Sequence, residues 1–180
     1  RRELGGSWTT RAGAGEGWLN GAAWTFGWLG LAGVNGSVGE NAPMDLAGAT
    51  FSGTASFDST DHAITDSGTR TVTGATPFDS GSANVSLEGA ASTFGSLTIT
   101  GAVLSVGEYA AMDLAGATIS GDFVVAVWRG SLTDRDAVTV GGTTTLATNA
   151  DDATIDLGNL AVTGSISVTT NGTSGDVTLV

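Results

Sequence analysis

The sequence predicts an all-β protein, a β-solenoid in which short strands wind into stacked coils. A sixteen-residue segment, VGENAPMDLAGATFSG from Val38, recurs as VGEYAAMDLAGATISG from Val106, with 13 of 16 positions identical. A second pair of segments, 141–157 and 163–179, aligns so that Gly142 matches Gly164. Short runs of alternating apolar residues, separated by Gly, Asn, Asp and Ser, fill most of the remainder. A fixed period in this range is typical of a solenoid, whose coils bury their inward faces by stacking.

The composition agrees with strands and excludes several classes of function. Hydrophobic residues make up 41% of the chain and charged residues 13%, with 29 glycines and 2 prolines, so the chain can bury a core. The net charge is -12, and all six basic residues are arginine, which argues against nucleic acid or anionic lipid as a partner. The absence of cysteine excludes disulfides, thiolate catalysis and cysteine-ligated zinc. We expect no cofactor and no metal.

The first 36 residues differ from the rest, because they hold four of the five tryptophans. We interpret 1–36 as a Trp- and Gly-rich cap or assembly segment, too broken by glycine for a transmembrane helix. Trp24, Phe26 and Trp28 alternate with small residues, which favours a strand with one aromatic face, although their spacing also allows a short helix. Together with Trp18, they are the predicted packing or assembly residues. Stacking on sugar rings is the alternative role.

Residues 37–180 form the predicted solenoid, with about 20–23 residues per coil and six or seven coils. In the sixteen-residue repeat, Met44 and Leu46 of the first copy, and Met112 and Leu114 of the second, are the predicted inward residues. The distance from Met44 to Met112 along the chain is close to three coils of this length. We therefore interpret the repeat as the duplication of a structural unit rather than of a catalytic centre.

Further along the chain, apolar residues at alternating positions mark the strands that follow. These inward-facing runs are Phe94–Leu97–Ile99, Phe123–Val125–Val127, Val138–Val140, Ile155–Leu157, Ile166–Val168 and Val177–Leu179. Period-two alternation in such short runs indicates half-buried sheet. In the aligned segments, Leu157 matches Leu179, and stacked coils would place these two side chains next to each other.

The segment IDLGNLAVTGSISVTTNGTSGDVTL resembles the repeats of filamentous-haemagglutinin-like exoproteins, large bacterial surface proteins exported by two-partner secretion or as autotransporters. The matching positions of its Leu-x-Val-x-Gly-x-Ile-x-Val pattern are Leu160, Val162, Gly164, Ile166 and Val168. The resemblance covers about residues 38–180 and implies a right-handed parallel β-helix. The asparagine-rich motifs of that family's secretion domain are absent from 1–36.

Three sets of polar residues are candidates for a site. Arg129, Asp134, Arg135 and Asp136, with Trp128 as a sugar platform, would suit a polysaccharide lyase or hydrolase if Arg129, Asp134 and Asp136 shared a groove with acids from neighbouring coils. The simpler interpretation is a loop held by ion pairs. Acidic turns such as "NADDATIDL" could supply calcium ligands, but aspartate also suits turns for its own sake. His62, the single histidine, has no nucleophile motif near it and suits an exposed loop.

The predicted function is that of a structural or adhesive β-solenoid segment of an exported bacterial surface fibre, secreted or at the cell surface. It would self-associate end to end or continue into a longer chain, with surface glycans as further partners and no membrane span. The chain lacks an initiator Met and ends within a predicted strand, so we expect a piece of a longer protein. An extracellular polysaccharide-active enzyme is the alternative, followed by an ice-binding solenoid suggested by threonine-rich runs such as "GGTTTLAT".

Overall fold

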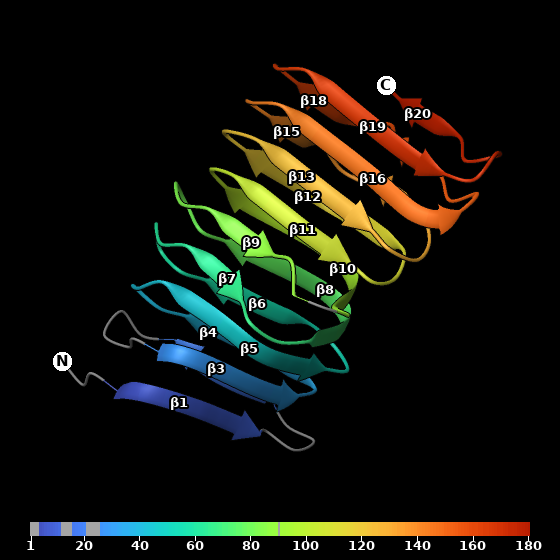
Figure 1. The fold of residues 1–180 in the computed structure, drawn as a ribbon. Coiled ribbons are helices and arrows are strands. Elements are labelled where there is room, and N and C mark those ends of the chain that lie inside the picture. Colours follow the sequence, from blue (N-terminus) through green and yellow to red (C-terminus); the bar gives the residue numbers. More distant parts are fainter. Residues whose placement is uncertain (1–3, 12–15, 21–25, 90) are drawn as a thin grey trace.

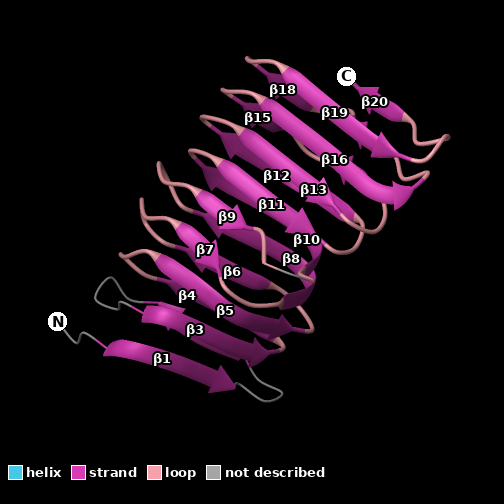
Figure 2. Cartoon of the chain, viewed as in Figure 1, coloured by secondary structure: helices cyan, strands magenta, loops and turns pink. Residues whose placement is uncertain are grey.

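The computed structural model in Figure 1 describes residues 4–11, 16–20, 26–89 and 91–180. Before Leu29, the description covers the strands and their pairing, and Leu19 is the one residue whose side chain is described. All regular structure in these residues is β-strand, as Figure 2 shows. No helix in the described part of the chain is long and apolar enough to cross a lipid bilayer. The all-β prediction is therefore confirmed.

Twenty strands belong to one sheet that winds about the axis of a rod, and every pairing between described strands is parallel. In chain order they are β1 (Leu4–Arg11), β2 (Glu16–Asn20), β3 (Phe26–Gly33), β4 (Asn35–Gly39), β5 (Met44–Phe51), β6 (Ala55–Asp58), β7 (Ile64–Asp66), β8 (Arg70–Asp79), β9 (Val85–Leu87), β10 (Thr93–Gly101), β11 (Leu104–Glu108), β12 (Met112–Ile119), β13 (Phe123–Val127), β14 (Leu132–Asp134), β15 (Val138–Val140), β16 (Thr144–Asp151), β17 (Ile155–Leu157), β18 (Leu160–Val162), β19 (Ile166–Asn171) and β20 (Val177–Leu179).

A ladder of directly paired residues shows how the coils stack. Its members, each paired in register with the next, are Met44, Ile64, Val85, Leu104, Phe123, Thr144 and Ile166. One step of this ladder is one coil, and the shortest steps lie on either side of Leu104. Seven members at about 4.8 Å per coil correspond to a rod about 30 Å long over this part. This confirms the predicted parallel solenoid and its number of coils.

The C-terminal coils follow the register that the sequence predicts. Leu157 pairs with Leu179, and Ile155 pairs with Val177. The backbone N–H of Gly164 donates to the carbonyl oxygen of Gly142 at 3.0 Å, which is the pairing expected from the alignment of the two segments. The prediction that these two segments are neighbouring coils is therefore confirmed.

The core is one apolar column along the rod axis, made of the inward residues of successive coils. Its members include Met44, Leu46, Met112 and Leu114, each at most 2% exposed, as predicted. The rings of Phe57 and Phe78 stack at 5.0 Å, and Phe94 meets Phe78 edge-on at 5.8 Å. Stacked and edge-on rings at these distances add to the stabilisation that burial gives.

The alternating pattern persists in the last coil, but burial does not. Ile166 and Val177 are 43% and 44% exposed, whereas the residues paired with them, Thr144 and Ile155, are 1% and 0% exposed. The last coil contacts a neighbouring coil on one side alone in this structure, which explains the difference.

The repeated unit does not contain a whole number of coils. Three coils along the ladder from Met44 lead to Leu104 on β11, whereas the second copy of Met44 is Met112 on β12. Met112 belongs to another ladder, in which it pairs with Leu132, which in turn pairs with Ile155. The second copy is therefore advanced by one strand, from β11 to β12. Equivalent residues of the two copies lie on different sides of the rod.

The strands before residue 37 belong to the same parallel sheet as the later strands, and β3 pairs with β5. β1 pairs with β3, and β2 pairs with β4, in the parallel sense of the rest of the sheet. Figure 1 shows β1 at the N-terminal end of the stack and β18 to β20 at the other. The division of the chain into a cap or assembly segment over 1–36 and a solenoid over 37–180 stays a prediction.

Candidate functional site

The predicted assembly residues fall in the least described part of the chain. Trp24 lies outside the described residues. Trp18 pairs with Ser37 on β4, and Phe26 and Trp28 lie on β3, where they pair with Leu4 and Ser7. The side chains of these three residues also lie outside what the structure describes, so their assembly role stays a prediction.

Aspartate carboxylates link neighbouring coils at the corners of the rod. Asp122 accepts hydrogen bonds from the backbone N–H and the hydroxyl of Thr143, on the next coil, at 2.8 and 2.9 Å. Asp152 accepts from the backbone N–H groups of Thr173 and Ser174, at 3.2 and 2.9 Å. The hydrogen bonds from Thr143 lower the pKa of Asp122.

The same arrangement occurs where the chain turns near β6. Asp61 accepts from the backbone N–H of Ser82 at 2.9 Å, and this contact lowers the pKa of Asp61. Asp61 and Asp152 have φ angles of 61° and 59°, a left-handed conformation that aspartate tolerates better than most residues. Within the described residues, no group of three acidic, histidine or cysteine side chains is arranged to hold a metal ion. The hydrogen bonds of Asp61, Asp122 and Asp152 fit the turn-forming role of these aspartates.

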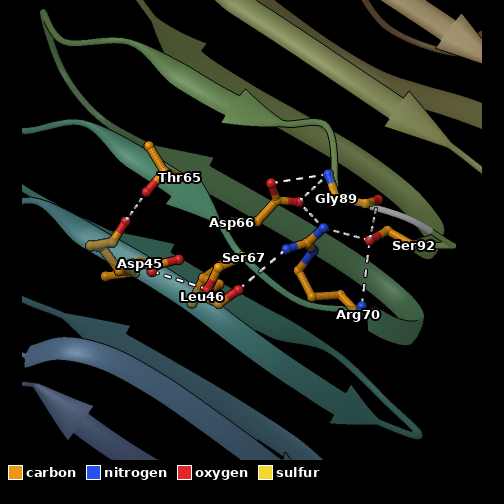
Figure 3. A network of polar contacts seen from close by, with 9 residues as sticks. Asp45, Leu46, Thr65, Asp66, Ser67, Arg70, Gly89 and Ser92 are labelled. Carbon is orange, nitrogen blue, oxygen red and sulfur yellow. Dashed lines mark hydrogen bonds and ion pairs between the residues drawn. The ribbon is translucent and has the colours of Figure 1, made fainter. Parts of the chain in front are cut away.

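A buried ionic network lies inside the rod where β7, β8 and β10 meet, and Figure 3 shows most of it. The Arg70 side chain is 0% exposed, and its guanidinium contacts the carboxylate of Asp66. It also donates to the carbonyl oxygen of Leu46 at 3.4 Å and to the hydroxyl of Ser92. Asp66 in turn accepts from the backbone N–H of Gly89 at 2.9 Å. The network therefore connects three successive coils.

Glu108, the last residue of β11, is a second buried charge near this network. It is 0% exposed, and its Oε1 accepts from the backbone N–H groups of Phe94 and Ala110 at 3.2 and 3.4 Å. Burial raises the pKa of Glu108 to about 8, although those two hydrogen bonds and the charge of Arg70 oppose the shift. Burial lowers the pKa of Arg70 to about 10, against the charges of Asp45 and Glu108. At neutral pH, Arg70 is charged and Glu108 is mostly protonated.

The duplicated unit explains why the network occurs once in this part of the chain. The second copy of Asp66 is Asp134, which accepts from the backbone N–H of Gly158 at 2.9 Å, as Asp66 does from Gly89. The residue that matches Arg70 in the second copy is Val138, which is fully buried and apolar. The aspartate is thus part of the repeated turn, whereas the arginine is particular to the first copy.

A surface groove of about 470 Å³ contains two residues of the predicted enzymatic cluster, Asp134 and Arg135. Its lining residues are Asp113, Thr133, Asp134, Arg135, Asp156, Gly158 and Asn159. Asp113 and Asp156 lie on the coils to either side of Thr133, so acids from three coils meet here. The Asp134 carboxylate is engaged by Gly158 and Asn159, and Arg135 forms an ion pair with Asp113. Arg129 and Asp136 are not among the lining residues.

Arg129 and Trp128 lie at another corner of the rod, beside Tyr109. The backbone N–H of Trp128 donates to the carbonyl oxygen of Glu108 at 2.7 Å, which stacks Trp128 on the coil that carries Tyr109. The guanidinium carbon of Arg129 lies 4.8 Å from the centroid of the Tyr109 ring, a cation–π contact. The predicted cluster is therefore divided between two places.

His62 belongs to a turn. Its Nδ1 lies 2.8 Å from the carbonyl oxygen of Thr60 and 3.2 Å from that of Ser59. The Ser59 hydroxyl donates to the carbonyl oxygen of His62. These local contacts agree with the loop role.

A family of repeats of unknown function, DUF5649, matches residues 33–101 and again 100–159. The two matches together cover more than two thirds of the chain. The chain belongs to this family. Neither a curated protein nor a solved structure matches it. The starts of the two DUF5649 matches are separated by nearly the same offset as Met44 and Met112, so one family repeat corresponds to the unit of three coils and one further strand. The family and the fold agree with a β-helix repeat protein. Membership of the filamentous-haemagglutinin type stays a prediction.

Sequence reasoning missed the buried charges of the DUF5649 repeats, although a signal was present. The segment Val-Gly-Glu begins both copies, and Glu40 and Glu108 are 2% and 0% exposed. A charged residue kept in both copies, at a position that alternates with an inward valine, marks a buried acid. Arg70 left a weaker signal, because it alternates with Val72 and matches Val138, which belongs to a predicted inward run.

Proposed function

We propose that this chain is a structural segment of an exported bacterial surface fibre or adhesin, a stiff rod that holds other parts of the fibre away from the cell. The observation that supports this most is the geometry of the repeated unit. It rebuilds the same apolar interior while turning its outward residues to another side of the rod, as Asp45 and Asp113 illustrate.

This geometry favours a mechanical role over a repeated binding face. An array of identical sites along one side would need equivalent outward groups in one ladder. The outward ladder that starts at Asp45 instead passes from this carboxylate through the hydroxyls of Thr65, Ser86 and Ser105 to the apolar Val124. An interior that recurs while the exterior varies is what a spacer requires, because stiffness depends on coil-to-coil hydrogen bonds and core packing.

The ends of the rod would join it to further coils of the same polypeptide or to a second copy. We place that contact in the Trp-rich segment that includes Trp18, Trp24, Phe26 and Trp28. A head-to-tail contact of this kind is heterologous and need not close, so it can build a filament.

Two measurements test the proposal. Antibodies against the purified chain should label intact cells along surface fibres, and protease added to intact cells should remove the label. Labelling that requires permeabilised cells would contradict export. Negative-stain electron microscopy of the purified chain should show straight rods or end-to-end fibres, and compact particles without a long axis would contradict the mechanical role.

A polysaccharide-active enzyme is the second candidate, favoured by the groove in which Asp113, Asp134 and Asp156 meet. Cleavage of acidic glycans, assayed with and without calcium, tests it. Asp134→Asn is the informative variant, because it removes the charge while keeping an acceptor for the Gly158 N–H. Activity that disappears in this variant would support the enzyme, and no cleavage by the unaltered chain would exclude it for those glycans.

A further inference from the structure

Tyr109, Trp128 and Arg129 form an exposed cluster that we call the aromatic corner. Trp128 is 54% exposed and Tyr109 is 40% exposed, and they belong to adjacent coils. Arg129 lies against the Tyr109 ring, which orients its guanidinium. Two large rings and a cation are thus grouped on the outside of a rod whose other exposed residues are mainly small or polar.

The fold does not require this cluster, as the other copy of the repeat shows. The matching residues of the first copy are Asn41, Thr60 and Asp61. Thr60 and Asp61 form a turn with positive φ angles of 43° and 61°, and Asp61 links its coil to the next through Ser82. Because polar residues suffice at the same corner of one copy, the aromatic rings of the other need a different explanation from coil stability.

Hydrogen-bonding groups border the rings on both sides along the axis. The Nε1 of Trp128 lies 3.8 Å from the point that a Cβ atom on Gly107 would occupy, and the backbone of Glu88 approaches the same point. The Glu88 carboxylate is held by the hydroxyl of Ser105. One coil further along, Asn149 is exposed, and its backbone carbonyl oxygen accepts from the side-chain amide of Asn171 at 3.0 Å.

We propose that the aromatic corner binds a neutral polysaccharide chain that lies along the rod axis. Sugar rings have apolar C–H faces that pack on aromatic rings and hydroxyl edges that bond to amide, carboxylate and guanidinium groups. Coils recur about every 4.8 Å, which is similar to the length of one hexose residue in an extended chain. The net charge of -12 disfavours a polyanion. This proposal is independent of the rod's role in a fibre.

Isothermal titration of the purified chain tests the proposal with cellohexaose, chitohexaose, xylohexaose and maltohexaose, and with hexagalacturonate as the anionic probe. We expect a neutral hexasaccharide to bind with a dissociation constant of about 1 mM or lower. The triple variant Tyr109→Asn, Trp128→Thr, Arg129→Asp restores the residues of the other copy and should weaken binding at least about tenfold. Val103→Thr removes an exposed apolar side chain elsewhere and should leave binding unchanged. Circular dichroism establishes that both variants are folded.

Three outcomes would overturn the proposal. The first is the failure of all four neutral probes to bind, and the second is binding that is equal in the triple variant. The third is preferential binding of hexagalacturonate. Sedimentation velocity distinguishes sugar binding from self-association. If the unaltered chain binds no sugar but self-associates, and the triple variant does not self-associate, the aromatic corner is a contact with a second copy instead.

Discussion

Met44 and Met112 occupy the same position in the two copies of the repeat, but they stand in different ladders of the rod. Met44 pairs with Ile64, and Met112 pairs with Leu132. The repeat is a unit of sequence and of core packing, and it is not a unit of the coil. Each copy therefore presents its outer surface in a new direction.

Distances between spin labels should report this rotation, and the absence of cysteine from the chain makes labelling straightforward. Thr65 and Val124 lie in one ladder, three coils apart, which corresponds to about 14 Å between backbones. Thr65 and Thr133 are equivalent in the repeat but lie in different ladders. We expect the distance between labels at 65 and 133 to be clearly longer than that between labels at 65 and 124. Equal distances would contradict the rotation.

Gly95 should be among the least replaceable residues of the core region. A Cβ atom there would lie 1.9 Å from the carbonyl oxygen of Thr73 on the preceding coil, so the coils would have to separate. We expect Gly95→Ala to reduce the free energy of unfolding by at least about 2 kcal/mol. Gly158→Ala is the control, because nothing lies within 4 Å of its Cβ position, and its effect should stay within about 0.5 kcal/mol. Urea denaturation measures both, and similar midpoints would show that the coil spacing is not so constrained.

Replacing Asp66 and replacing Arg70 should reduce the free energy of unfolding by different amounts. Asp66→Ala leaves the fully buried guanidinium of Arg70 without its acid partner, and we expect a loss of about 3–5 kcal/mol. Arg70→Val should reduce stability less, because Asp66 would still accept the hydrogen bond from the Gly89 N–H. The second copy shows the same arrangement, in which Asp134 accepts from the Gly158 N–H although Val138 stands in place of the arginine. The comparison uses urea midpoints for the two variants. A larger loss for Arg70→Val would mean that the carboxylate depends on the arginine.

The stability of the rod should fall as pH rises through the range in which Glu108 ionises. Its pKa of about 8 in the folded chain lies above the ordinary value of 4.5, so the folded state retains a proton that the unfolded state has lost. The stabilisation is complete below pH 4.5 and is lost progressively up to about pH 8. Arg70, with its pKa of about 10, stays charged throughout this window and adds no slope.

Glu108→Gln removes this titration while keeping the shape and the acceptor of the side chain. Between about pH 5 and pH 9, the unaltered chain should lose of the order of 2–4 kcal/mol more stability than the variant. Thermal unfolding at several pH values provides the measurement. Glu88→Gln, at an exposed carboxylate on the preceding coil, is the matched control and should leave the slope as it is. Parallel profiles for Glu108→Gln and the unaltered chain would contradict the assignment.

The sequence by itself determined the fold, the inward residues and the pairing of the last coils. Alternation marks the buried side of a strand directly, so Met44, Leu114 and Val125 could be placed in the core without coordinates. The alignment of 141–157 with 163–179 placed Leu157 on Leu179, because parallel coils must bring equivalent residues into contact.

The tertiary structure alone decided how the copies are oriented and which buried ionisable groups lie close enough to interact. The coil from Thr144 to Ile166 is longer than the coils from Val85 to Leu104 and from Leu104 to Phe123. Extra residues in the turns at the corners of the rod lengthen a coil without changing the apolar pattern of its strands. The offset between the two copies therefore matched three coils in the sequence, whereas in the structure it is three coils and one strand.

The buried charges depend on the stacking in the same way. Arg70 on β8 and Glu108 on β11 are far apart in the sequence, and the winding of the coils brings their charges close enough to interact. Burial by neighbouring coils, which shifts both pKa values, has no counterpart within either local segment. The sequence therefore shows which side of a strand faces inward, whereas only the stacked structure shows which of the inward ionisable groups interact.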